Sequence, residues 1–152
     1  MNPQLAQNYL RTKVLTATPE QLQLMLFDGA IRFGEQARLA MEKRNWEQTF
    51  VLISKMQRIV TEMVGSLKHD VAPDLCGKLS SLYNYALRCM IAASSQHKIE
   101  SLDEALSVLK YQRETWVLLL DKLARDRAAT AARQLDMPSP DERMEASISL
   151  QG

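Results

Sequence analysis

The 152-residue sequence contains few of the residues that break helices or build turn-rich β structure. It has five glycines, five prolines and only 6% aromatic residues, a composition that disfavours an all-β chain with many turns. Its longest apolar runs cover only a handful of positions, far short of the ~20 residues that a membrane-spanning helix needs. We therefore expect no transmembrane segment. Because residues 1–13 lack an apolar core, we expect no signal peptide either.

An excess of charge of one sign is also missing. The sequence has 19 basic and 18 acidic residues, so the formal net charge is +1. A chain with this balance has no strong overall field that would draw it to nucleic acid or to anionic lipid. The basic stretch near residues 122–133 is interrupted by Asp126 and resembles an ordinary solvated helix face. We predict neither nucleic-acid binding nor membrane insertion.

Cysteine is limited to Cys76 and Cys89. On one helix, thirteen residues at 1.5 Å each would separate them by about 20 Å, whereas a disulfide needs Cα atoms within about 7 Å. We therefore predict two free thiols. Free thiols are typical of a reducing compartment, so the predicted localisation is cytoplasmic.

The residue patterns that serve catalysis or metal binding are missing as well. Neither His69 nor His97 has a glutamate three positions before it, so the Glu-x-x-His motif of di-iron helical bundles is absent. Neither histidine belongs to an H-E-x-x-H motif, and the cysteines form no C-x-x-C pair. Asp28 has no second carboxylate or base placed to work with it, so we interpret it as a partner in an interhelical hydrogen bond or ion pair. We predict a non-enzyme without a cofactor.

Apolar residues at three- and four-residue spacing predict four long helices. Each of three predicted starts carries an N-cap residue followed by an amide or carboxylate three positions later: Thr18 with Gln21, Asn45 with Gln48, and Ser101 with Glu104. Short loops make sequential helices antiparallel neighbours. The predicted fold is therefore all-α, an antiparallel up-down four-helix bundle whose helices cover residues 19–43, 45–67, 73–95 and 101–127.

The two ends differ from this central part, residues 18–127. We interpret residues 1–17 as a weakly apolar capping segment that is too short to fold alone. Residues 128–152 lack sustained periodicity and are expected to be a largely disordered, flexible tail, although residues 128–135 are compatible with an extension of the fourth helix.

Small residues and methionines mark the predicted helices. Gly29 and Ala30 lie within the apolar stripe of the first helix, where they would let another backbone approach closely. The glycine costs roughly 1 kcal/mol in helix propensity. Five of the eight methionines fall in helical segments: Met25, Met41, Met56, Met63 and Met90. Their flexible thioethers suit either an adaptable binding surface or ordinary core packing, and the sequence leaves both interpretations open.

The predicted helices are apolar over more than the stripe of about 100° that a bundle helix needs. The N-terminal segment, a second copy of the chain or a partner protein would cover the excess, and composition alone slightly favours a homodimer. Being off the main stripes, the surplus residues should be partly exposed in the free protein. They include Ile59, Val64, Tyr83, Leu87, Ile91, Leu106 and Val117.

Several segments resemble the flagellar export chaperone family FliS. Residues 16–33, TATPEQLQLMLFDGAIRF, are similar to its N-terminal signature, an S/T-A-S-P start followed by L-Y/F-D-G-A. Residues 82–85 are similar to the L-Y-D-Y segment of the family, with Asn84 in place of the usual aspartate. Trp116 occupies the position at which the family has a tryptophan in its last long helix. The resemblance runs from about Tyr9 to about Lys122, whereas residues after about Arg127 extend past many members.

The resemblance implies a cytosolic type III export chaperone that binds the disordered C-terminal region of flagellin and prevents premature polymerisation. It implies that the client docks as extended and short helical pieces in hydrophobic grooves, and that the flagellar export gate is a further partner. It also implies that the region around Tyr9, Leu10 and Val14 caps the free groove. The sequence leaves the monomer and homodimer open, and a structural homodimer or interaction protein without a flagellin client is the alternative function.

Overall fold

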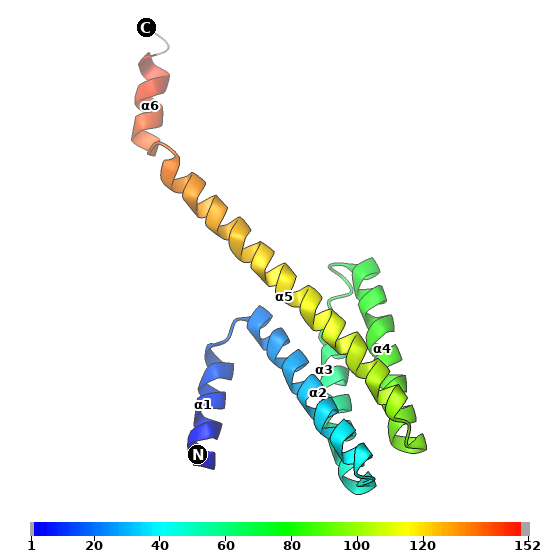
Figure 1. The fold of residues 1–152 in the computed structure, drawn as a ribbon. Coiled ribbons are helices and arrows are strands. Elements are labelled where there is room, and N and C mark those ends of the chain that lie inside the picture. The colour runs from blue at the N-terminus through cyan, green and yellow to red at the C-terminus, as the bar shows by residue number, and fades with distance from the viewer. Residues whose placement is uncertain (1, 150–152) are drawn as a thin grey trace. The chain divides into compact units, whose positions relative to one another are not determined.

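The computed structural model describes residues 2–149, and this part of the chain contains helices but no strands (Figure 1). The helices are α1 (Pro3–Thr16), α2 (Pro19–Glu42), α3 (Trp46–Gly65), α4 (Pro73–Gln96), α5 (Ile99–Asp136) and α6 (Pro140–Ser149). The chain divides into two compact units, Met1–Val117 and Leu118–Gly152. We use the term helical body for α2, α3, α4 and the part of α5 up to Val117.

Side-chain caps start α2 and α3 where the sequence predicts them. The Thr18 hydroxyl accepts a hydrogen bond from the Gln21 backbone N–H at 3.2 Å, and the Gln21 side-chain oxygen accepts one from the Thr18 backbone N–H at 3.0 Å. Asn45 accepts a hydrogen bond from the Gln48 backbone N–H at 3.2 Å. These bonds satisfy donors that the first turn of a helix otherwise leaves unpaired.

The predicted capping box of the fourth helix is wrong. The helix begins two residues earlier, at Ile99, so Ser101 lies within its first turn. His97 adopts a left-handed conformation with φ of 54° after α4, which turns the chain within two residues. Glu104 is therefore free to reach α4, where the Tyr85 hydroxyl donates a hydrogen bond to it.

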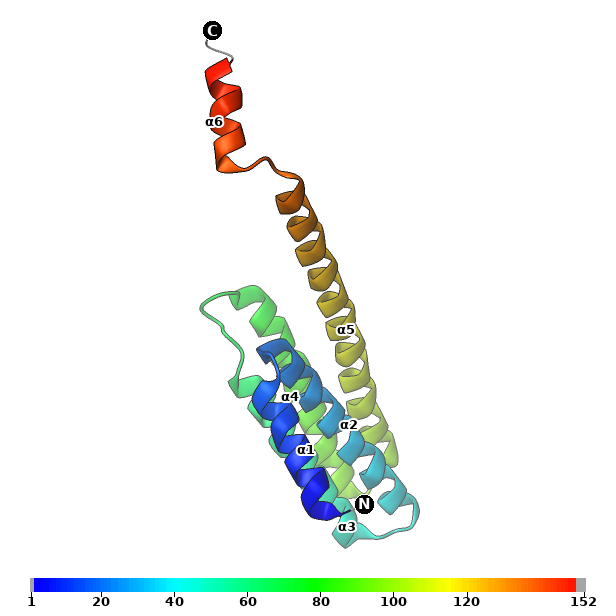
Figure 2. The same ribbon diagram turned by 90° about the vertical axis from the view of Figure 1, so that its left-hand side faces the viewer.

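Contacts between named residues show how the helices of the helical body pair. Gly29 lies against Ile59, and the Phe33 ring lies near the Lys55 ammonium, so α2 and α3 run antiparallel. The Trp46 and His97 rings stack with centroids 3.9 Å apart, which joins the start of α3 to the end of α4. The α2, α3 and α4 helices lie side by side in both ribbon views (Figures 1 and 2).

Polar contacts join α2 to α5 in the antiparallel sense. The Trp116 indole N–H donates to the Glu20 carbonyl at 3.0 Å near the start of α2. Toward its end, Arg38 Nε donates to Asp103 Oδ1 at 2.7 Å. Between them Asp28 pairs with Arg113, which confirms the interhelical role predicted for this aspartate.

The core is built from one buried stripe on each helix of the helical body. Four of the five helical methionines, Met41, Met56, Met63 and Met90, are at most 1% exposed, so these four serve core packing rather than an exposed binding surface. The other large, fully buried residues are Phe27, Thr49, Ile53, Val60, Leu102 and Leu109.

Some large apolar residues of α3 and α4 face outward, although their neighbours in sequence are buried. Phe50 of α3 is 63% exposed, whereas Leu52 is buried in the core. On α4, Leu75 and Leu82 are exposed and Tyr83 is buried. A wide apolar surface contains two overlapping stripes, and the neighbouring helices determine which stripe is covered.

The closest approach to a glycine of α2 occurs at Gly34. A Cβ atom added there would lie 2.5 Å from Leu106 Cδ2 and 3.0 Å from Met56 Cε. At Gly29 the nearest atom, Ile59 Cδ1, would be 3.3 Å away. The expected close packing at Gly29 is present, but the tighter contact lies at a glycine that the motif did not single out.

The C-terminal region is helical where we expected a largely disordered tail. The α5 helix continues to Asp136, in line with the helix-compatible residues 128–135, and α6 covers Pro140–Ser149. A local signal explains α6: the Ser139 hydroxyl and the Glu142 carboxylate exchange hydrogen bonds with the backbone N–H groups of one another. Residues 150–152 of the predicted tail lie outside the described residues.

Candidate protein-binding surfaces

The predicted partner-binding residues of the helical body fall into two groups by exposure. Ile91 is 58% exposed, and four others are partly buried: Ile59, Val64, Leu87 and Val117. Ile59, Val64 and Leu87 also pack against the core from its edge. These five residues remain candidates for contact with a partner.

The expectation of partial exposure is wrong for Tyr83 and Leu106, which are each 3% exposed. The Tyr83 ring packs near the Phe27 ring, with centroids 6.5 Å apart. Leu106 fills the space above Gly34, where no side chain of α2 intervenes. Both side chains are core residues, because the adjacent helices approach α4 and α5 from these sides.

The N-terminal residues Tyr9, Leu10 and Val14 lie on α1 and are exposed. None of the described side chains of α1 is buried. The structure therefore does not show the capping contact that we expected from this segment. The apolar residues of α1 provide a physical reason: Leu10 and Leu15 are five positions apart and point to different sides, so no continuous stripe forms.

An apolar surface on α3 and α4 combines two predicted partner-binding residues of α4 with Phe50, an exposed residue of α3. Ile91 of α4 is exposed, and Leu87 precedes it by one helical turn. Phe50 lies one turn beyond Trp46 on α3. Because Trp46 stacks on His97, the antiparallel register places Phe50 and Ile91 at the same end of this helix pair. We call Phe50, Leu87 and Ile91 the α3–α4 apolar surface.

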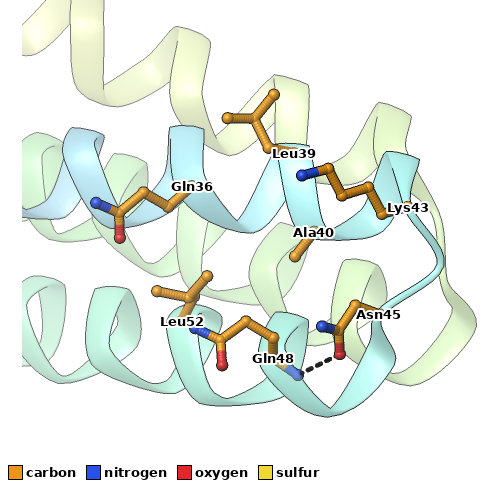
Figure 3. A pocket seen from close by; sticks show the side chains of 7 residues that line it. All are labelled: Gln36, Leu39, Ala40, Lys43, Asn45, Gln48 and Leu52. Carbon is orange, nitrogen blue, oxygen red and sulfur yellow. Dashed lines mark hydrogen bonds between the residues drawn. The ribbon is translucent and has the colours of Figure 1, made fainter.

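A hollow lies between α2 and α3, with a volume of about 300 Å³. Figure 3 shows that its residues come from both helices, with Gln36 and Ala40 on α2 and Leu52 and Gln48 on α3. Leu39 is 57% exposed and lies at this edge of α2. We call this hollow, lined by Gln36, Leu39, Ala40, Lys43, Asn45, Gln48 and Leu52, the α2–α3 groove.

The opposite edge of α2 is polar and already paired. Glu35 forms an ion pair with Lys110 of α5, and Arg38 pairs with both Asp103 and Glu42. The carboxylate of Asp103, with that of Glu42, raises the pKa of Arg38 above its ordinary value. Because its charges are matched within the protein, this edge is a poor surface for an apolar partner.

Ionisable groups on α4 and α5 form one small cluster without catalytic character. The Tyr85 hydroxyl donates to Glu104 at 2.5 Å, and this bond is the main reason that the pKa of Tyr85 rises to about 12. Cys89 Sγ lies 3.6 Å from the same carboxylate, and burial is the main cause that raises the pKa of its thiol. A thiol with a raised pKa is a poor nucleophile, because the thiolate is the reactive form.

Residues 2–149 contain two cysteines, Cys76 and Cys89, both on α4. Cys76 and Cys89 are both buried and unpaired, as predicted. Within this range no group of three or more histidine, cysteine, aspartate or glutamate residues is arranged to hold a metal ion. None of the described helices is long and apolar enough to cross a membrane.

Comparisons with known proteins agree on one family. The family model described as flagellar protein FliS matches residues 1–123. The flagellar secretion chaperone FliS of Bacillus subtilis is 28% identical over 126 residues, which cover 83% of this chain and 92% of that protein. The protein of the same name from Salmonella typhimurium is 29% identical over 112 residues, covering 73% of this chain and 83% of that protein.

A solved structure supports the relationship at the level of the fold. A crystal structure of a bacterial flagellar chaperone superposes with a TM-score of 0.65 at 18% identity, covering 80% of this chain and 99% of that one. The sequence signature at residues 16–33 lies within the matched region, and the family consists of chaperones rather than enzymes. With the family model covering most of its length, the chain belongs to the FliS family of flagellar secretion chaperones.

Proposed function

We propose that this protein is a cytoplasmic type III export chaperone that binds the disordered C-terminal region of flagellin. Bound in this way, the region would be kept from polymerising before secretion and filament assembly. In this proposal α2, α3, α4 and α5 form an antiparallel up-down bundle that offers apolar surfaces to the client. The flagellar export gate would then receive the chaperone with its client.

One observation carries the proposal: large apolar side chains remain exposed although the core is complete without them. Phe50 and Ile91 are 63% and 58% exposed, whereas the core beneath them contains fully buried Ile53, Met56 and Met90. Residues of this type on neighbouring helices form the surface that an amphipathic client helix needs. Exposed apolar residues on adjacent elements mark an interaction site when they gather in one place.

The exposed surface must be extensive for a disordered client. Ordering such a segment costs roughly 2–5 kcal/mol or more of the gross interaction energy. The α3–α4 apolar surface, with Ile59, Val64 and Val117 at partly buried positions elsewhere on the helical body, offers several contacts rather than one pocket. This distribution suits a client that wraps around the protein in several pieces.

The exposed N-terminal helix fits the same proposal as a movable cap. The Tyr9, Leu10 and Val14 side chains are exposed on α1, so they are available to cover an apolar surface when no client is bound. A cap that contributes little burial of its own would be displaced at a low cost in free energy.

The decisive experiment is a titration of the full chain with the last ~40 residues of flagellin from the same organism, a length that allows several helical turns and extended links. We expect Ile91→Asp to weaken binding by more than about tenfold, because the complex would bury an unpaired charge. The free energy of unfolding should change by no more than about 0.5 kcal/mol, as for other surface substitutions.

Val71→Asp provides the matched control, since Val71 is exposed on the segment between α3 and α4, outside the apolar surface. It should leave binding unchanged. An Ile91→Asp protein that binds flagellin normally would place the client elsewhere on the protein. If the unaltered protein bound no flagellin at all, the proposed client would be wrong.

A further inference from the structure

The two long edges of α2 differ in charge. Toward α5 the helix carries Asp28 and Glu35, and both carboxylates are paired with cations of α5. Toward α3 lie Arg32 of α2 and Lys43, which caps the C-terminal end of α2, and α3 adds Lys55. Cations therefore collect on the side of α2 where the α2–α3 groove lies.

These three cations have no carboxylate partner among residues 2–149. Arg32 and Lys55 both lie over the Phe33 ring, each with its charged group 5.5 Å from the ring centroid. These contacts leave the positive charge of both residues uncompensated, because a cation–π contact neutralises no charge. Lys43 lines the groove itself and forms no ion pair in the described part of the chain.

The α2–α3 groove combines apolar side chains with neutral polar groups. Leu39, Ala40 and Leu52 supply the apolar atoms, and the amides of Gln36 and Gln48 lie beside them (Figure 3). No aspartate or glutamate lines the hollow. An apolar floor with cations along it complements a helix that has an apolar face and carboxylates beside that face.

The spacing of the cations indicates how far apart the carboxylates of a bound helix would lie. Arg32 on α2 and Lys43, the C-cap of α2, are eleven residues apart, which corresponds to roughly 16 Å along the helix axis. The contact of Lys55 with Phe33 places it near the Arg32 end. A helix lying along the groove would meet two cations at one end and one cation about three turns further on.

We infer that the α2–α3 groove binds an acidic amphipathic helix of the client. The carboxylates that contact the cations are about eleven residues apart, with apolar residues at three- and four-residue spacing between them. This inference rests on the proposed chaperone function, and it assigns one segment of the client to one surface by charge. Phe50, Leu87 and Ile91 of the α3–α4 apolar surface are uncharged, so this surface is left to apolar segments of the client.

Three designed helical peptides of about 18 residues test the inference on the full chain, a length that spans the groove with a turn to spare. They share one apolar face and carry glutamate, glutamine or lysine at the two flanking positions. In fluorescence anisotropy titrations the glutamate peptide should bind tightest and the lysine peptide weakest. The difference should be about tenfold at low ionic strength and shrink at 0.5 M salt, because exposed charges are then screened over about 4 Å.

Charge-reversal variants test whether the preference for the glutamate peptide comes from cations at the groove. Lys43→Glu and Lys55→Glu should each weaken binding of the glutamate peptide by about threefold and strengthen binding of the lysine peptide, as expected for exposed ion pairs. Lys78→Glu changes the net charge equally at an exposed position of α4 and should have no such effect. Urea unfolding of each variant verifies that the fold is retained.

Three results would overturn the inference: equal affinities for the three peptides, the absence of any peptide binding, or an equal effect of Lys78→Glu and Lys43→Glu. Self-association of the protein that is lost in Lys43→Glu would assign the groove to a second copy instead. If neither Lys43→Glu nor Lys55→Glu changed the affinity for flagellin, this inference would be overturned and the proposed function would remain intact. A protein that binds the glutamate peptide but not flagellin would overturn the proposed flagellin client and leave the groove's preference for an acidic helix intact.

Discussion

Two glycines on α2 differ in how much space surrounds them. Around Gly34 the neighbouring side chains are Leu106, 3% exposed, and Met56, fully buried, so neither has free volume to move into. Around Gly29 the neighbour is Ile59, which is only partly buried. Packing at these two positions should therefore respond differently to the same added methyl group.

We expect Gly34→Ala to lower the free energy of unfolding. Overpacking typically costs about 1–3 kcal/mol, and only about 1 kcal/mol returns through the higher helix propensity of alanine. Gly29→Ala should be close to neutral, since its tightest contact is milder. Urea unfolding of the two variants beside the unaltered protein measures the difference, and a Gly34→Ala protein as stable as Gly29→Ala would contradict the packing argument.

The buried phenol of Tyr83 should make the stability of the protein depend on pH in the alkaline range. Burial raises its pKa from 10.0 to about 12, so the folded state holds this proton more tightly than the unfolded chain does. The contribution of Tyr83 to stability is complete below pH 10 and is lost as the pH rises toward about 12, by at most ~1.4 kcal/mol per pH unit.

Urea unfolding between pH 9 and about 12 measures this loss, because that range spans the shift in pKa. Tyr83→Phe should lose less stability over the range than the unaltered protein does. Tyr111→Phe, at an exposed position of α5, should behave like the unaltered protein. A Tyr83→Phe curve parallel to the original would mean that this phenol does not drive the alkaline loss.

At the scale of single elements, the pairing of α2 with α5 depends on contacts spread along both helices. Most of them are exposed ion pairs, which usually contribute little. The hydrogen bond from the Trp116 indole to the Glu20 carbonyl is partly buried and ties α5 to the first turn of α2. This bond should therefore matter more than its neighbours.

Replacing Trp116 with phenylalanine removes the donor while keeping an aromatic ring. We expect the free energy of unfolding to fall by about 1 kcal/mol, the usual net contribution of such a bond. Amide hydrogen exchange should accelerate in the first turns of α2 more than in α4. Unchanged exchange near Glu20 would show that the bond does not hold this end of α2.

At the scale of the whole molecule, the family match ends at nearly the same residue where buried side chains cease among the described residues. The family model ends at residue 123. From Ala124 to Ser149, every side chain whose burial is described is exposed. The described side chains of residues 124–149 therefore contribute nothing to the core.

A chain that ends after Leu123 should keep the unfolding midpoint of the full protein. The expected change in the free energy of unfolding is within about 0.5 kcal/mol, because only exposed residues are removed. Circular dichroism should show a loss of helical signal without a change in the transition. A markedly lower midpoint would reveal a stabilising contact of the C-terminal region.

Local features of the fold follow from sequence, because they involve residues close together in the chain. The caps at Thr18 and Asn45 and the freedom of the two thiols on α4 are of this kind. The cap at Ser139 is equally local. Its S-P-x-E pattern is typical of a helix start, but we predicted disorder there because the segment lacks apolar periodicity. The Ser101 pattern shows the limit, since a matching motif need not be the one that starts a helix.

The division of apolar residues between core and surface depended on tertiary structure. Tyr83, Leu106 and Ile91 all lie off the predicted stripes, yet the first two are buried and the third is exposed. Helical periodicity determines that a side chain lies on a given face, but the register of the neighbouring helices determines whether that face is covered. The charge on the two edges of α2 follows the same rule. The sequence supplies the cations and carboxylates, but only the packing of α2 against α3 and α5 determines which of these charged side chains form ion pairs.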